Sequence, residues 1–202
     1  MKKCWIGLPL AMLVGCATPV ARQESALAVR AFCCNSVRDF SYQPFAPESE
    51  VALKLDETAP VYDFGRGKTY FRAVRLDGGA SQVLAIRSHF NGMLIGQYLQ
   101  PIIAFLDDSY SLIAEGTPVL RFIRATFRVD AHMGGVVEVP QNARYAIVST
   151  AKFDPEPDPA RTGPGINVFM IGNTPVVTPS SGASYKLTRS PTGEVWLKLV
   201  NQ

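Results

Sequence analysis

Residues 69–88 read TYFRAVRLDGGASQVLAIRS, two strand-like runs on either side of a turn signal. In the two runs, residues 69–76 and 82–88, apolar side chains recur with a period near two. Between them lies Asp77-Gly78-Gly79, and glycine reaches the backbone angles that tight turns require. This stretch therefore predicts extended strands joined by a turn.

Runs of the same kind continue on both sides of this stretch. They begin near Glu50 and comprise residues 51–55, 61–64, 98–106, 110–113, 125–129 and 143–150. Turn residues separate the runs and amphipathic helix is scarce, so the sequence predicts a mainly β fold, an antiparallel β-sandwich or jelly roll. Pro101 has no backbone N–H to donate, and its run is therefore expected at a sheet edge or a bulge.

The 202-residue chain divides into four expected parts. They are a lipoprotein signal peptide at 1–15, a lipidated tether with a short helical turn at 16–48, the β-sandwich at 49–152, and an extension at 153–202. The extension opens with prolines alternating with acidic residues, which favours an extended chain. It closes with a candidate β-hairpin formed by residues 185–189 and 195–200.

Composition restricts the class of protein. Hydrophobic residues make up 47% and charged residues 18%, which is typical of a globular domain and excludes disordered and coiled-coil classes. The formal charge is +3, and removing Lys2 and Lys3 with the signal leaves 18 basic against 17 acidic residues. A net charge of about +1 gives no electrostatic reason to expect nucleic acid as a partner.

The N-terminus carries an export signal. Lys2 and Lys3 precede an apolar stretch, residues 4–14, that is too short to span a bilayer. The stretch ends in Leu13-Val14-Gly15-Cys16, which resembles a bacterial lipobox, whose cysteine receives diacylglycerol before cleavage. Ala17 after the cysteine implies sorting to the outer membrane. The resemblance predicts a periplasmic lipoprotein that is held at the outer membrane by a triacylated Cys16.

Cys33 and Cys34 are the cysteines that remain after processing. Adjacent Cα atoms lie about 3.8 Å apart, closer than most disulfides allow. A vicinal disulfide, two partly buried thiols, and intermolecular pairing or metal ligation are all left open. Ligation would need His89 or His132, and neither stands at a recognisable ligand spacing from the pair.

The sequence offers no catalytic residue, metal site or cofactor that we would assign. The serine elbow Gly-x-Ser-x-Gly is absent, and His89 and His132 are expected to be exposed loop residues. Asp107 and Asp108 are adjacent and are expected to cap a turn rather than to act as a glycosidase pair. Asp154, Glu156 and Asp158 alternate with proline, which argues against a calcium loop.

Trp196 is the candidate carbohydrate contact. It alternates with Val195, Leu197 and Leu199 in its run, so if that row is buried, Trp196 shares an accessible face with Lys198. An exposed indole can stack on a sugar ring. The competing interpretation is an aromatic side chain that is packed or lies at an interface.

Four features of the sequence occur in a fixed order: the Cys33-Cys34 pair before a short turn, the GKTYF motif at 67–71, the PIIAFLD motif at 101–107 and the TGEVWLKL motif at 192–199. In this order they resemble the maltose operon periplasmic protein family. The resemblance covers residues 33–200. It implies an envelope protein, frequently lipidated, that is encoded with maltodextrin uptake and has no established catalytic activity, so no functional residue is carried over.

Together these features predict a non-catalytic lipoprotein that supports maltodextrin transport or binds glycans at the outer membrane. The alternative is a structural or assembly protein of the envelope that binds a protein partner through a sheet edge such as the one expected at Pro101.

Overall fold

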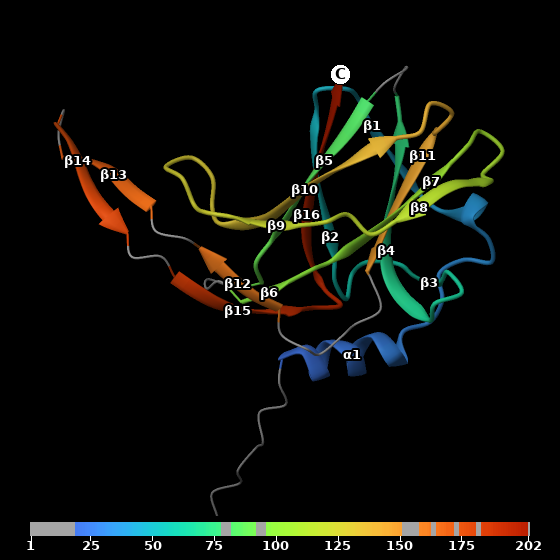
Figure 1. Cartoon of the computed structure of the whole chain (residues 1–202). Coiled ribbons are helices and arrows are strands. Elements are labelled where there is room, and N and C mark those ends of the chain that lie inside the picture. The colour runs from blue at the N-terminus through green and yellow to red at the C-terminus, as the bar shows by residue number, and fades with distance from the viewer. Residues whose placement is uncertain are drawn as a thin grey trace, which may run out of the picture.

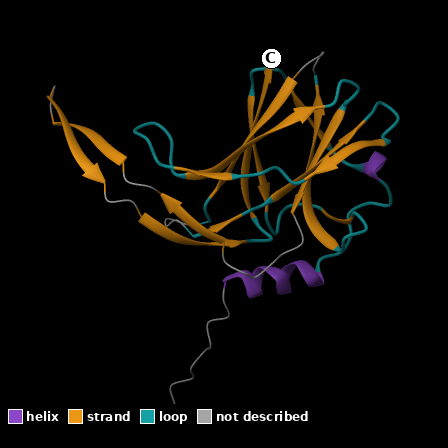
Figure 2. Ribbon diagram, in the orientation of Figure 1, coloured by secondary structure: helices purple, strands orange, loops and turns teal. Residues whose placement is uncertain are grey.

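The computed structural model describes residues 19–77, 82–91, 96–150, 158–162, 165–171, 174–180 and 183–201. Within them the chain is mainly β, with several antiparallel sheets and one short helix near the N-terminus, as the sequence predicts. Figure 2 shows two sheets packed face to face, with the helix below them. The signal peptide and Cys16 lie outside the described residues, as do Asp154 and Glu156. No helix in the described ranges is long and apolar enough to cross a membrane.

Two sheets, A and B, form the sandwich (Figure 1). Sheet A has the order β1-β4-β11-β7-β8, with β3 also paired to β4; the strands are β1 (Tyr42–Phe45), β3 (Val61–Asp63), β4 (Lys68–Leu76), β7 (Pro101–Leu106), β8 (Leu112–Gly116) and β11 (Tyr145–Thr150). Sheet B has the order β2-β16-β5-β10-β9, built from β2 (Glu50–Leu55), β5 (Gln82–His89), β9 (Arg121–Ile123), β10 (His132–Val139) and β16 (Gly193–Asn201).

Two smaller sheets reach away from the sandwich (Figure 1). One joins β6 (Gln97–Tyr98), β12 (Asp158–Thr162) and β15 (Ala183–Arg189), and the other is the hairpin of β13 (Gly165–Ile171) and β14 (Thr174–Ser180). The two strand-like runs within residues 69–88 lie in different sheets. Residues 69–76 belong to β4 of sheet A, and residues 82–88 belong to β5 of sheet B.

Strict alternation along the strands builds the core between sheets A and B. In β16, Val195, Leu197 and Leu199 are completely buried while the residues between them are half-buried on the outer face. The same core holds Leu84 and Ile86 of β5. Burying one such side chain stabilises the fold by roughly 1.5–3 kcal/mol. The sandwich is thus held together by facing apolar rows, one from each sheet.

The outer face of sheet A is covered rather than exposed. Phe40, Phe71 and Ile147 are buried there, and Tyr42, Tyr62, Phe64, Tyr110 and Tyr145 pack against them. Phe40 lies 4.1 Å from Phe71 between ring centroids. Because this cluster covers the sheet, every residue of β7 is buried.

The segment before β1 helps to form that cover. α1 (Pro19–Val29) begins the described chain, and the 3-10 turn Val37–Asp39 follows it. Asp39 accepts hydrogen bonds from the backbone and hydroxyl of Ser36, which stabilises the start of the turn. Cys33 and Cys34 are joined by a disulfide, and Cys34 packs against the aromatic cluster on sheet A.

The C-terminal strands differ from the expected hairpin. β15 pairs with β12 and β6, whereas β16 lies between β2 and β5 in sheet B. The two strands therefore do not pair with each other. The physical reason is the apolar row of β16, which is fully buried only when a strand lies on each side of it. Residues 193–201 thus belong to the sandwich and not to an extension.

Two other expectations on strands are corrected. Pro101 is the first residue of β7, which lies between β11 and β8, so the expected edge is wrong. The register of β7 does shift in this run, between Phe105 and Leu106, away from the proline. The missing N–H of proline is tolerated at the first residue of a strand. Residues 125–129 form a turn instead of a strand, because the Thr126 amide donates to the carbonyl of Val129 (2.8 Å).

Candidate functional site

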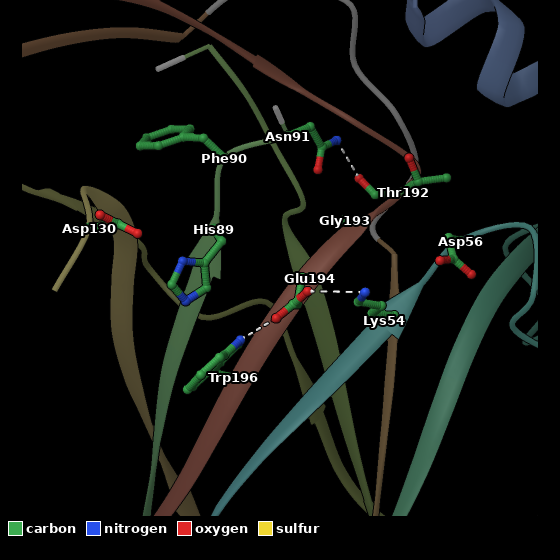
Figure 3. Close-up of a pocket in the computed structure, with 10 residues that line it drawn as sticks. All are labelled: Lys54, Asp56, His89, Phe90, Asn91, Asp130, Thr192, Gly193, Glu194 and Trp196. Atoms are coloured by element: carbon green, nitrogen blue, oxygen red, sulfur yellow. Dashed lines mark hydrogen bonds and ion pairs between the residues drawn. The ribbon is translucent and has the colours of Figure 1, made fainter. Parts of the chain in front are cut away.

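A groove of about 500 Å³ lies at one end of the outer face of sheet B (Figure 3). There the ends of β2 and β5 meet the beginnings of β10 and β16, because neighbouring strands run antiparallel. We call this site the groove; it is lined by Lys54, Asp56, His89, Phe90, Asn91, Asp130, Thr192, Gly193, Glu194 and Trp196. Its volume is within the range of small-molecule sites.

Three rings cross the face of the sheet beside the groove, and we call them the aromatic strip: Trp196 of β16, His89 of β5 and His132 of β10. The His89 ring centroid lies 5.4 Å from that of Trp196 and 5.9 Å from that of His132. Arg87 approaches Trp196 on the same face, 5.9 Å from the ring centroid. The ring planes are tilted, by 56° between His89 and Trp196 and by 34° between His89 and His132. His132 is buried, so Trp196 and His89 are the rings that line the groove.

Trp196 is held in place by its neighbours. Its indole Nε1 donates to Glu194 Oε1, and the other carboxylate oxygen of Glu194 lies 3.9 Å from Lys54 Nζ. Figure 3 shows these three side chains in line across β16 and β2. Because the carboxylate binds both partners, it fixes the indole on the outer face, as the alternation of β16 predicts.

His89 is neutral near pH 7. Burial disfavours the imidazolium ion and the nearby His132 adds to this, so the pKa of His89 is lowered from its ordinary 6.5. Its Nε2 is buried and has no hydrogen-bond partner. His132 is oriented by its own contact, a 2.8 Å hydrogen bond between Nδ1 and the carbonyl oxygen of Asp130.

The two histidines were expected in loops, and this is corrected. His89 ends β5 and His132 begins β10, where the two residues are directly opposite each other. The expectation of a loop at His132 comes from Gly134-Gly135, because paired glycines are typical of a turn. Here these glycines permit close packing, since a Cβ on Gly135 would lie 2.7 Å from the carbonyl oxygen of Val119.

The upper rim of the groove is a polar turn between β15 and β16. Asn91 donates through Nδ2 to the carbonyl of Thr192 (2.9 Å) and to Ser190 Oγ (3.0 Å). Ser190 Oγ in turn donates to Gln23 of α1 at 2.7 Å. The helix is therefore joined to the rim of the groove, which makes this turn a fixed wall.

The carboxylates at the groove serve as hydrogen-bond acceptors. Asp56 Oδ1 accepts from the amide and hydroxyl of Thr58, and the hydroxyl bond lowers the pKa of Asp56 most. Glu194 is bound to Trp196 and Lys54, and Asp130 lies at the far side (Figure 3). A neutral, hydroxyl-rich ligand would find acceptors on both sides of the rings.

Within the described part of the chain, the serine beside His89 in sequence is not placed to act as a nucleophile. Ser88 is adjacent in sequence but is buried in the opposite direction, where its hydroxyl donates to the carbonyl of Leu99 at 2.6 Å. Asp107 Oδ1 accepts from Ser109 and Ser111 and so caps a turn, as expected. Among the described residues, no group of three or more His, Cys, Asp and Glu side chains is placed to hold a metal ion.

The predicted site residues are thus distributed over two faces. Trp196 lies in the groove on sheet B, whereas Cys34, which is disulfide-bonded to the exposed Cys33, packs against the outer face of sheet A. Sequence reasoning missed Lys54 and Glu194. The signal that could have found them is the outward position of Glu194, two residues before Trp196 on the same strand.

No protein-family model matches the chain, and neither does any curated protein or solved structure.

Proposed function

We propose that this protein is a non-catalytic lipoprotein of the bacterial periplasm, anchored to the outer membrane through Cys16, that binds a glycan in the groove. One observation carries the proposal: Trp196 and His89 present adjacent rings on an open sheet face, next to fixed hydrogen-bonding groups. Sugars stack their apolar faces on such rings and bind their hydroxyls to amides and carboxylates.

The arrangement of the groove supports binding rather than turnover. The rings are fixed before the ligand arrives, because Glu194 holds Trp196 and the packing of β5 and β10 holds His89. Preorganised side chains lose little entropy on binding. Glu194 is already bound by Lys54 and Trp196, which favours the role of an acceptor over that of an acid catalyst.

The resemblance to the maltose operon periplasmic protein family suggests the first ligand to try. Maltodextrins are neutral α-glucans with many hydroxyls, and their curved chains suit an open groove better than a closed pocket. We therefore propose an accessory role in carbohydrate transport, in which the anchored protein holds maltodextrin or a related glycan close to the outer membrane.

A thermal-shift screen tests this proposal. A glycan at 100 times its dissociation constant adds about 2.7 kcal/mol to the free energy of unfolding, so a maltodextrin ligand raises the melting temperature by several degrees. Trp196→Ala is expected to abolish the shift. Phe127→Ala removes a fully exposed ring outside the groove and serves as the matched control, which keeps the shift.

The second candidate function is that of an envelope assembly protein. It is favoured by β8, the edge strand of sheet A, where all five residues are exposed and Leu112 keeps 60% of its surface accessible. A partner strand could add to this edge. The edge is not the one we expected, because Pro101 lies in an internal strand. An absence of any thermal shift with glucans would favour this second function.

A further inference from the structure

The segment from residue 116 to residue 129 has an unusual charge pattern. It contains three arginines and no carboxylate, and it connects β8 to the turn after β9. Arg121 and Arg128 are both exposed. The segment is therefore a cationic edge on a chain whose other charges are nearly balanced.

Exposed apolar side chains lie within this cationic edge. Phe127 is fully accessible at 102%, and Val119 and Ile123 are 79% and 43% exposed. Val136 of the neighbouring strand β10 is 66% exposed. Large hydrophobic side chains are scattered singly on most surfaces, but here four of them accompany arginines along one edge of sheet B.

The turn that carries Phe127 is ordered. The Thr126 amide donates to the carbonyl of Val129, and the Thr126 hydroxyl accepts from the amides of Arg128 (3.4 Å) and Val129 (3.2 Å). Figure 1 shows the loop between β9 and β10 projecting from the sandwich. Phe127 is thus displayed at the tip of a preformed turn, which reduces the entropy lost on docking.

We propose that this edge docks the protein onto an anionic lipid surface, with Phe127 inserted at the level of the headgroups. Aromatic rings favour that level of a bilayer, and arginines near an anionic surface each contribute attraction. Charge complementarity selects the lipid: the segment carries three arginines, whereas the neighbouring carboxylates are Asp130, one residue beyond it, and Glu115, which is already paired with Arg66. A projecting tip enters a fluid interface readily, whereas a protein partner would need a pocket shaped to receive it.

This inference is independent of the glycan groove and of the anchor at Cys16. Docking would orient the body against the membrane and thereby set the direction in which the groove opens. The anchor alone restricts position but not orientation. A test must therefore detect contact at Phe127 itself and not merely attachment of the chain.

Quenching by brominated lipid provides such a test. The full chain carrying Phe127→Trp is mixed with vesicles of brominated phosphatidylcholine containing about 30% phosphatidylglycerol, and the fluorescence of the wild type is subtracted. We expect blue-shifted emission that is quenched at least about twofold. Leu112→Trp, an exposed position on β8, is the matched control and is expected to remain unquenched.

The charge dependence is tested with Arg121→Gln and Arg128→Gln on the Phe127→Trp background. Each arginine contributes roughly fivefold to surface affinity, so the double change removes most of the quenching, as does omitting phosphatidylglycerol. Three results would overturn the proposal. They are equal quenching at positions 112 and 127, no quenching at position 127, and quenching at position 127 that is unchanged when phosphatidylglycerol is omitted. If Phe127→Trp unfolds, Val119→Trp, another exposed position of the cationic edge, replaces it in the same quenching measurement, and unquenched emission there refutes the proposal.

Discussion

Gly193 lies where the rim of the groove meets the core. A Cβ on this residue would lie 2.7 Å from the Cβ of Leu99, which is completely buried. The position therefore has no room for a methyl group without moving β16 or the start of β7.

We predict that Gly193→Ala destabilises the protein by about 1–3 kcal/mol, the usual cost of overpacking a core. Urea unfolding measures the change. Gly116→Ala is the matched control, because nothing lies within 4 Å of the Cβ position there. Equal stability of the two variants would mean that the close approach of Gly193 to Leu99 is absent.

His89 makes the stability of the protein depend on pH. Its pKa is lowered on folding by burial, so between the folded pKa and 6.5 the unfolded chain binds more protons than the folded one. The contribution of His89 is then complete above about pH 6.5 and is lost as the pH falls from 6.5 toward the folded pKa.

Replacing His89 by Phe keeps a ring in the aromatic strip and removes the titration. We predict that the free energy of unfolding of His89→Phe falls less than that of the wild type between pH 7.5 and pH 5. Denaturant unfolding at the two pH values gives the difference. Parallel curves for the two proteins would exclude His89 as the source of the acid sensitivity.

The sequence predicts the orientation of some site residues but not which of them meet. The outward orientation of Trp196 follows from the buried Val195 and Leu197 beside it, so the sequence could predict it. The meeting of His89 with His132 could not be predicted, because it depends on the pairing of β5 with β10, and Gly134-Gly135 conceals β10. Glycine is typical of turns, but it also permits close packing between neighbouring segments.

At the scale of the elements, β16 is the last strand among the described residues and an internal strand of sheet B. It pairs with β2 on one side and β5 on the other. Residues 193–201 therefore connect β2 to the rest of sheet B.

We predict that Leu197→Ala, at a completely buried position of β16, costs about 2–5 kcal/mol of stability. Lys198→Ala on the outer face of the same strand is expected to change stability by no more than about 0.5 kcal/mol. Chemical denaturation of both variants checks this. A small effect of Leu197→Ala would contradict a core strand and favour the detachable extension.

Periodicity predicted most strands of the sandwich but not their partners. Residues 51–55 and 69–76 lie in β2 and β4, and residues 145–150 of the run 143–150 form β11. Pairing depends on contacts between residues far apart in the sequence, such as Trp196 with Arg87, and no local pattern encodes them. For that reason the hairpin expected from residues 185–189 and 195–200, which are close in sequence, is wrong.

At the scale of the whole molecule, the two outer faces of the sandwich differ. The face of sheet A is covered by the aromatic cluster around Phe40, whereas the face of sheet B presents the groove and the cationic edge. The face of sheet B is therefore where we place both proposed contacts, the glycan and the lipid surface.

The proposed anchor gives a prediction for the whole chain. Cys16→Ser removes the thiol that would carry diacylglycerol, so we expect the variant to leave the detergent phase or to remain unprocessed. Phase partitioning in detergent, with the wild type beside it, measures this. Unchanged partitioning of Cys16→Ser would show that the protein is not held by a lipid at this residue.

The central claim is that a glycan stacks on Trp196 in the groove, and the fluorescence of this residue tests it most directly. Trp196 is the only tryptophan once residues 1–15 are removed, so the intrinsic emission of that chain reports on the groove alone. Titration with maltodextrins is predicted to change the emission in a saturable way, with a shift to shorter wavelength. Emission that stays constant across a series of glucans, while the protein remains folded, would contradict the account.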